Sequence, residues 1–259
     1  MALSRPAWGL GTRPPWGRLT FTLALCLEAV PKAIDMPELL HHAEGSGALG
    51  LGLALALVAL ALRWCWRDDD RAGWAIVALF GVAWLIERAS AEGHQGVRHG
   101  SLLPVSALIA ILATPRVTGS RSAALAQEAA WGAVAAVYTL AGLSKVLGSG
   151  LAWFSPTNLG LLILERAADA PEPLMSLRLA VAGSPALCVA LATGALLAEL
   201  GGAALLWPRA RPFVALALIF THVGIAALMG YVYASWALVL LALTWGRLRH
   251  DPSPEAPAG

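Results

Sequence analysis

Long apolar segments separated by short polar turns run along almost the whole chain. Hydrophobic residues make up 58% of the 259 residues and charged residues only 13%, a balance that is too apolar for a water-soluble domain. Segments of this kind are typical of proteins whose helices cross a bilayer several times. We therefore expect an all-α fold, a polytopic bundle of membrane helices in contact with the lipid bilayer and without a large water-soluble part.

The placement of charges argues against nucleic-acid binding, and the placement of cysteines argues against a cysteine-based metal or redox site. The net charge is only +2, and the arginines are dispersed at segment ends, which argues against nucleic-acid binding. The three cysteines, Cys26, Cys65 and Cys188, have no metal-binding or redox spacing, and we interpret them as packing residues. Only Lys32 and Lys145 among the 18 basic residues are lysines, so these two need an explanation in a chain that otherwise uses arginine.

The apolar pattern predicts about eight transmembrane helices, or six or seven because the fourth is short. The predicted spans are 17–35, 47–62, 73–87, 102–114, 125–147, 185–207, 213–229 and 231–245. An additional helix at 159–168 follows a Ser-Pro-Thr-Asn sequence with N-cap chemistry. Ten residues cannot cross a core of about 30 Å at roughly 1.5 Å per residue, so we expect this helix to lie at the interface or to re-enter.

The domain organisation follows from these spans. Residues 1–16 lack an apolar stretch that ends in a small-residue cleavage site, so we predict a cytoplasmic N-terminus rather than a removable signal peptide. A single transmembrane domain is expected over 17–247, and the Pro-rich tail over 248–259 is predicted to be disordered.

Arginine placement predicts the orientation of the bundle. In the eight-span order, twelve basic residues fall on the side of the two termini, against four arginines in the opposing loops. Basic residues concentrate on the cytoplasmic side of a membrane protein. We therefore expect both termini in the cytoplasm and segment 148–183 outside. The preference for arginine suggests a GC-rich bacterial genome, and hence a bacterial inner membrane.

The segment 125–147 carries the polar groups that most constrain function. Trp131, Tyr138 and Lys145 stand seven residues apart and therefore share one face of a helix. An ammonium within a lipid-spanning helix costs roughly 2.5–3.5 kcal/mol on insertion scales, and such groups usually face a protein interior or a water-filled cavity.

Ionisable groups from several spans are predicted at similar depth. Counting roughly 1.5 Å per residue from the segment ends places six of them in the outer leaflet. Lys32, Glu87 and Lys145 are expected within about one or two turns of the outer surface, and Glu28, Tyr138 and His222 about 10 Å inside it. The same count places Glu128 and Glu199 in the inner half. Such a cluster predicts a polar chamber that opens outward.

Two of these predictions have alternatives. Glu28 and Lys32 lie four residues apart on one helix and can instead form a pair that only makes insertion tolerable. Four loop histidines, His41, His42, His94 and His99, give a metal site only as a minor alternative, and we predict no metal.

One stretch resembles a known family. YTLAGLSKVL (138–147), followed by Trp153, is similar to the region around the catalytic lysine of vitamin K-dependent γ-carboxylase and its bacterial relatives, the horizontally transferred transmembrane (HTTM) family. Residues 196–241 resemble the later helix pair of that family, with Glu199, Arg211-Pro212 and His222 in corresponding places. The resemblance covers about residues 125–247, while 1–124 matches only in general hydropathy.

The resemblance implies a set of roles. Lys145 would be the base that deprotonates a vitamin K-like hydroquinone, and His222 would orient or stabilise an oxyanion. Tyr138 joins these two as a catalytic candidate. The candidates for substrate binding are Trp153, Glu199, Glu28 and Lys32. In the carboxylase, a lyase that also forms an epoxide, oxygenation of this reduced quinone yields a strong base that removes a glutamate γ-proton before CO2 is added.

Two departures separate the chain from the carboxylase. Ser144 precedes the lysine where the carboxylase has a second lysine, and the chain has no room for the large lumenal portion that recognises a substrate propeptide. We therefore do not expect carboxylation of peptide glutamates.

Two classes of function remain open. The first is an intramembrane enzyme that acts on a lipid-soluble small molecule with Lys145 as base. The second is a non-catalytic small membrane protein, similar to the DoxX-like group, which assists a partner complex of unknown identity. Transport is disfavoured because the sequence shows no inverted repeat.

Overall fold

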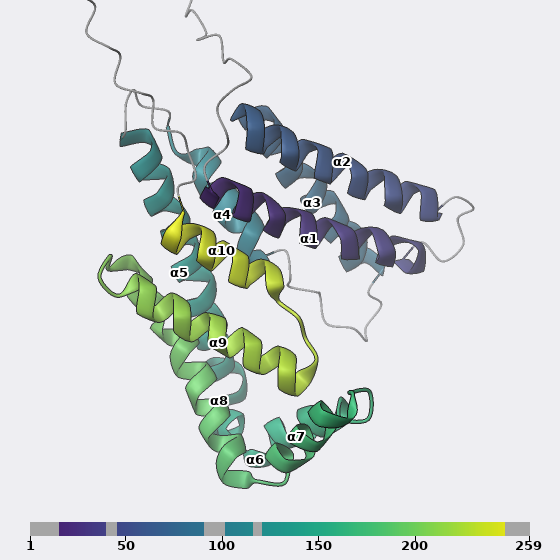
Figure 1. Ribbon diagram of the computed structural model, residues 1–259, viewed down its shortest axis with the longest axis vertical. Coiled ribbons are helices and arrows are strands. Elements are labelled where there is room, and N and C mark those ends of the chain that lie inside the picture. The colour runs from purple at the N-terminus through teal and green to yellow at the C-terminus, as the bar shows by residue number, and fades with distance from the viewer. Residues whose placement is uncertain (1–15, 40–45, 91–101, 116–120, 247–259) are drawn as a thin grey trace, which may run out of the picture.

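The computed structural model describes residues 16–39, 46–90, 102–115 and 121–246, and within these ranges every regular element is a helix (Figure 1). Side chains are described for all of these residues except 29–39, 46–50, 86–90 and 121–122. The elements in chain order are α1 (Trp16–Leu39), α2 (Ser46–Arg67), α3 (Asp70–Ser90), α4 (Leu102–Ala113), α5 (Arg121–Ser149), η1 (Gly150–Phe154), α6 (Pro156–Glu165), α7 (Glu172–Ala182), α8 (Pro185–Leu200), η2 (Gly201–Leu206), α9 (Arg211–Met229) and α10 (Ala234–Trp245). The expected all-α fold is confirmed.

Fewer helices than predicted can cross a membrane. Among the described residues, three stretches are long and apolar enough: Ala123–Phe154, Pro185–Leu206 and Arg211–Met229. The predicted count of about eight spans is therefore not supported. The 12-residue helices α4 and α10 extend only about 18 Å, short of a hydrocarbon core of about 30 Å. Helix α1 is long enough to cross, but it carries charged residues at positions 18, 28, 32, 35 and 38 and is not among the three.

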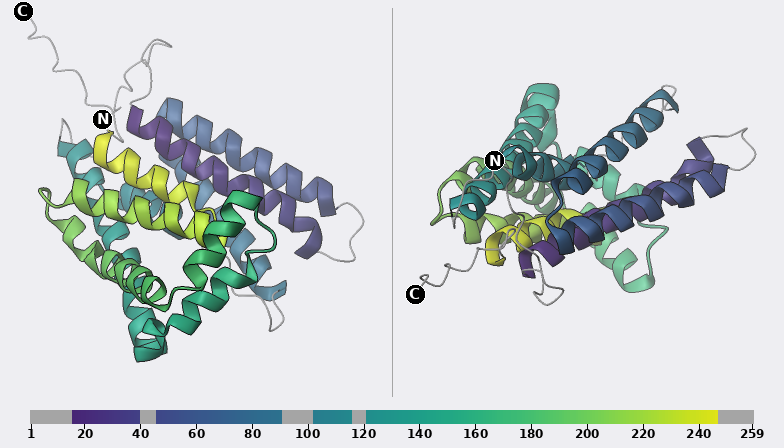
Figure 2. Two further views of the ribbon diagram at one scale, coloured as in Figure 1. Left: turned by 60° about the horizontal axis from the view of Figure 1, so that its bottom comes forward. Right: turned by 90° about the horizontal axis from the view of Figure 1, so that it is seen from above.

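The stretch between α5 and α8 differs from the prediction in its details. The short helix expected at 159–168 is present but begins earlier, as α6, with Pro156 in its first turn. A second short helix, α7, follows it and was not predicted. Both pack against α8 and form a hairpin away from α2 and α3 (Figures 1 and 2).

Helix α5 is the centre of the bundle. It contacts α4, α8, α10, η1 and η2, and its residues Trp131, Val134 and Tyr138 are buried in the core. The predicted span 125–147 lies entirely within this helix, which confirms the helix while extending it at both ends.

Several helix ends meet at one end of the molecule, toward the left of Figure 1. Arg18 of α1 forms an ion pair with Asp68, which follows α2. The backbone of Gly246 touches that of Gly17, because a Cβ on Gly246 would lie 2.2 Å from the Gly17 Cα. The Nε2 of Gln127 in α5 donates to the Leu243 carbonyl of α10 at 2.6 Å. We call this region the basic end.

The α9 helix is tied to the basic end by its first residue. Arg211 forms an ion pair with Glu128 of α5 at 2.5 Å, and its guanidinium stacks over the Trp131 ring at 5.4 Å. Nearby, the turn between α2 and α3 is closed by Arg63, which donates to Asp69 at 2.7 Å and thereby lowers the pKa of that carboxyl. The basic end thus gathers those described segment ends that the eight-span order placed on one side.

Candidate functional site

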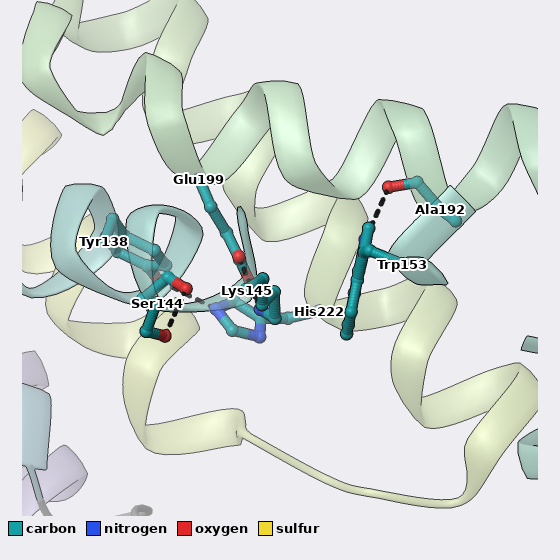
Figure 3. A network of polar contacts seen from close by, with 8 residues as sticks. Tyr138, Ser144, Lys145, Trp153, Ala192, Glu199 and His222 are labelled. Carbon is teal, nitrogen blue, oxygen red and sulfur yellow. Dashed lines mark hydrogen bonds and ion pairs between the residues drawn. The ribbon is translucent and has the colours of Figure 1, made fainter. Parts of the chain in front are cut away.

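The site is built on the second half of α5. Tyr138 and Lys145 lie two turns apart on this helix, and both side chains point toward residues of α8 and α9 (Figure 3). Tyr138 is 1% exposed, whereas the Lys145 side chain is 27% exposed. The shared face that the seven-residue spacing predicts is therefore present, with the phenol deeper in the protein than the amine.

Lys145 is held by a carboxylate and an aromatic ring. Its Nζ donates to both Oε1 and Oε2 of Glu199, near the end of α8. The Nζ also lies 5.2 Å from the centroid of the Trp153 ring, in η1, within the range of a cation–π interaction. The Trp153 Nε1 in turn donates to the Ala192 carbonyl of α8 at 3.4 Å. The ammonium charge is thus compensated inside the bundle.

Tyr138 forms the second pair of the site. Its hydroxyl lies 2.7 Å from Nε2 of His222, in the middle of α9. The histidine is 9% exposed, and its Nδ1 is buried with no hydrogen-bond partner among the described residues. If the phenol donates to Nε2, a neutral imidazole carries its hydrogen on Nδ1, and in the opposite tautomer Nδ1 is an acceptor. Either way one nitrogen is left for another polar group.

Aromatic rings from the start of α10 enclose His222. The ring centroids of Tyr233 and Trp236 each lie 5.5 Å from that of His222, and the Trp236 ring meets Tyr138 edge-on at 5.4 Å. These contacts limit rotation of the imidazole and hold it against the phenol.

Two glycines allow the helices that carry the site to approach closely. A Cβ on Gly202 would lie 2.6 Å from Tyr138 Cβ, and a Cβ on Gly142 would lie 3.0 Å from the Leu200 backbone nitrogen. Small residues permit such close packing between membrane helices. The contact brings the α8–η2 junction, and with it Glu199, to the Lys145 face of α5.

The structure corrects the predicted depths. Lys145 was expected near the outer surface and Glu199 in the inner half, but the two form an ion pair. The count of residues assumed that the span ends at position 147, whereas helical structure continues past Lys145 through η1 to Phe154. Glu128, which the same count placed in the inner half, forms an ion pair with Arg211.

Five of the seven candidate residues meet in this site: Lys145, Tyr138, His222, Trp153 and Glu199. Glu28 of α1 accepts a hydrogen bond from the Ser235 hydroxyl of α10, next to the Trp236 ring that packs against His222. The Lys32 side chain is outside the described residues, so its pairing with Glu28 stays a prediction. The outward-opening chamber also stays a prediction.

Sequence reasoning missed Tyr233, Trp236 and Gly202. The aromatic-rich sequence 231–236 and the Gly-Gly pair 201–202 were the available signals. The four loop histidines lie outside the described residues. Within the described parts of the chain, no three His, Cys, Asp or Glu side chains are grouped in a way that could hold a metal ion.

Comparison with protein-family models, curated proteins and solved structures finds no match to this chain.

Proposed function

We propose that this chain is an intramembrane enzyme that binds a lipid-soluble, hydroquinone-like molecule at the Lys145 site and uses Lys145 as a base. The observation that supports this most is the meeting of two hydrogen-bonded pairs, Lys145–Glu199 and Tyr138–His222, contributed by all three membrane-length helices. Ionisable residues within membrane segments mark functional sites by default.

The charges of the site favour a neutral ligand. Lys145 and Glu199 cancel each other, so an ionic ligand would bring an uncompensated charge into a low-dielectric region. A hydroxyl group can both donate and accept hydrogen bonds. The buried and unpartnered Nδ1 of His222 fits a ligand oxygen, and the nearby aromatic rings fit a flat apolar body.

The residues divide the chemistry between them. To act as a base, Lys145 first releases the proton of its paired ammonium to water, which its 27% exposed side chain reaches. The neutral amine then takes the proton of a ligand hydroxyl onto Nζ and becomes an ammonium again. Glu199 then holds that ammonium through the two hydrogen bonds already described, which favours the charged product. His222, positioned by Tyr138, faces the oxygen that has lost its proton. A reduced quinone would supply the redox chemistry when bound.

The resemblance to the HTTM family supports this proposal, since Lys145, Glu199 and His222 take the places of that family's motif. It points to carboxylase- or epoxidase-like lyase chemistry on a substrate other than a peptide. We also propose a location in a bacterial inner membrane with both termini cytoplasmic, because the basic residues favour that orientation.

A second candidate is a non-catalytic, DoxX-like protein that assists a partner complex. The Lys145–Glu199 pair favours it, because two partly buried groups that satisfy each other need no substrate.

The test is identification of small molecules that co-purify with the detergent-extracted protein, by mass spectrometry. A hydroquinone or quinone should accompany the wild type and be lost from His222→Phe. Thr221→Ala is the matched control, because among the described residues the Thr221 hydroxyl bonds only the Ala217 carbonyl of its own helix. A stoichiometric partner protein without a small ligand would instead establish the second candidate.

A further inference from the structure

Four tryptophans at the basic end are exposed, and each lies at or next to one end of a helix of the bundle. Trp16 begins α1, Trp66 lies one residue before the end of α2, Trp207 follows η2, and Trp245 ends α10. Their exposed fractions are 69%, 57%, 67% and 51%. We propose that these tryptophans form a ring at the membrane–water boundary and that the arginines beside them bind anionic phospholipid headgroups.

The contacts of the basic end place the four rings on one side of the molecule. Trp16 and Trp245 adjoin Gly17 and Gly246, whose backbones touch. Trp66 precedes Asp68, which pairs with Arg18.

Trp207 joins the same side through the start of α9. It lies four residues before Arg211, which is tied to Glu128 of α5. The neighbouring Gln127 reaches the carbonyls of Leu243 and Gly246 at the end of α10. The helix ends that carry the four rings are therefore linked to one another by contacts in the structure and not only by their order in the sequence (Figure 1).

The chemistry of tryptophan fits a lipid boundary better than water. An indole has a large apolar body and a single N–H donor, and tryptophan is enriched where headgroups meet the hydrocarbon core. Full exposure of four such rings to water would be unfavourable. A bilayer surface contacts all four at once, since they lie on separate helices that end at the same side.

The charge at this end selects anionic lipid. Three of its carboxylates are occupied by arginines of the protein: Asp68 by Arg18, Asp69 by Arg63 and Glu128 by Arg211. Asp70 is a fourth carboxylate of the basic end, and its side chain is half-buried. The side chains of Arg67, Arg71 and Arg209 are exposed, and none of them forms an ion pair with a described carboxylate. Guanidinium groups bind phosphate oxygens bidentately, so these three arginines face the headgroups.

The experiment uses the full chain in phosphatidylcholine nanodiscs that contain a small fraction of spin-labelled lipid. The label lies either near the glycerol backbone or near the end of the acyl chain. The fluorescence contributed by one tryptophan is the difference between the wild type and its Trp→Phe variant. The contributions of Trp66 and Trp245 should be quenched more strongly by the shallow label.

Trp84 is the matched control. It is 44% exposed but lies about 21 Å along α3 from the basic end. The deep label should quench its contribution more strongly. If the deep label quenches Trp66 and Trp245 as strongly as the shallow label, or more strongly, the proposed ring is wrong. An absence of quenching by either label would also overturn it and would indicate a surface covered by protein.

The lipid preference is tested with shallow-labelled phosphatidylglycerol and phosphatidylcholine at equal mole fraction. Phosphatidylglycerol should quench the Trp66 and Trp245 contributions more by about twofold or greater. The ratio should fall toward one in the Arg67→Gln/Arg71→Gln/Arg209→Gln variant. If that variant does not fold, Arg209→Gln alone should lower the ratio. An unchanged ratio in the folded variant would overturn the assignment of the arginines.

Discussion

At the scale of single residues, the site depends on which atoms Lys145 and His222 contact. The sequence singles out both residues, because each is polar in an apolar segment. The structure adds that the Lys145 Nζ donates to both carboxylate oxygens of Glu199. The Nδ1 of His222, in contrast, has no hydrogen-bond partner among the described residues. Lys145 therefore already has a charged partner in the structure, whereas His222 has a nitrogen that can accept or donate a further hydrogen bond.

Comparison of Lys145→Arg with Lys145→Ala separates proton transfer from charge pairing. Arginine keeps the positive charge and can pair with Glu199, but it is effectively never deprotonated. If Lys145 is a base, both variants should lose about 100-fold or more in product formation with the molecule identified by co-purification.

Ser144→Ala is the control for these variants and should leave activity unchanged, since within the described parts of the chain the Ser144 hydroxyl bonds only the Ala141 carbonyl of its own helix. Full activity of Lys145→Arg would refute proton transfer and leave the lysine as an ion-pair partner.

At the scale of helices, the approach of η2 to α5 positions the site. Gly202 lies where any side chain would meet Tyr138 at its Cβ, an atom that cannot move without the backbone of α5. The same approach places Glu199 beside Lys145. Backbone proximity at one position thus controls both hydrogen-bonded pairs.

Gly202→Ala should destabilise the protein by about 1–3 kcal/mol, because the added methyl group overpacks this contact. Thermal unfolding in detergent, followed by the loss of helical circular dichroism, measures the change. Gly201→Ala is the matched control, as a Cβ there meets nothing within 4 Å. Equal stability of the two variants would show that η2 does not pack against Tyr138 as described.

At the scale of the whole molecule, the basic end joins both ends of the described chain. Gly17 and Gly246 touch there, and the turn between α2 and α3 is held by Arg18 through Asp68. The first described helix therefore begins, and the last one ends, on the same side of the bundle, which is compatible with two cytoplasmic termini.

Cysteine-accessibility labelling tests that orientation. In a background whose native cysteines are replaced by alanine, Ala170→Cys should react with an impermeant maleimide added outside intact cells, because segment 148–183 is expected outside. A cysteine at the C-terminus should react only after permeabilisation, and Arg67→Cys should follow the C-terminus. Labelling of position 170 and the C-terminus on the same side would contradict the predicted orientation.

The sequence alone determined the helical class, the central helix and most of the polar residues that the structure brings together in the candidate site. These follow from local properties: apolar runs with helical length, and rare polar groups within them. The span 125–147 and the residues Tyr138, Lys145 and His222 are of this kind.

The tertiary structure decided which of these residues are partners. Counting residues placed Lys145 and Glu199 in different halves, because the count depends on where each helix ends, and η1 and η2 extend two of the helices beyond their α-helical ends. Pairing depends on how closely α5 and η2 approach, which Gly202 permits but no spacing in the sequence encodes. The register between two packed helices is set by side-chain volume at their contact rather than by local periodicity.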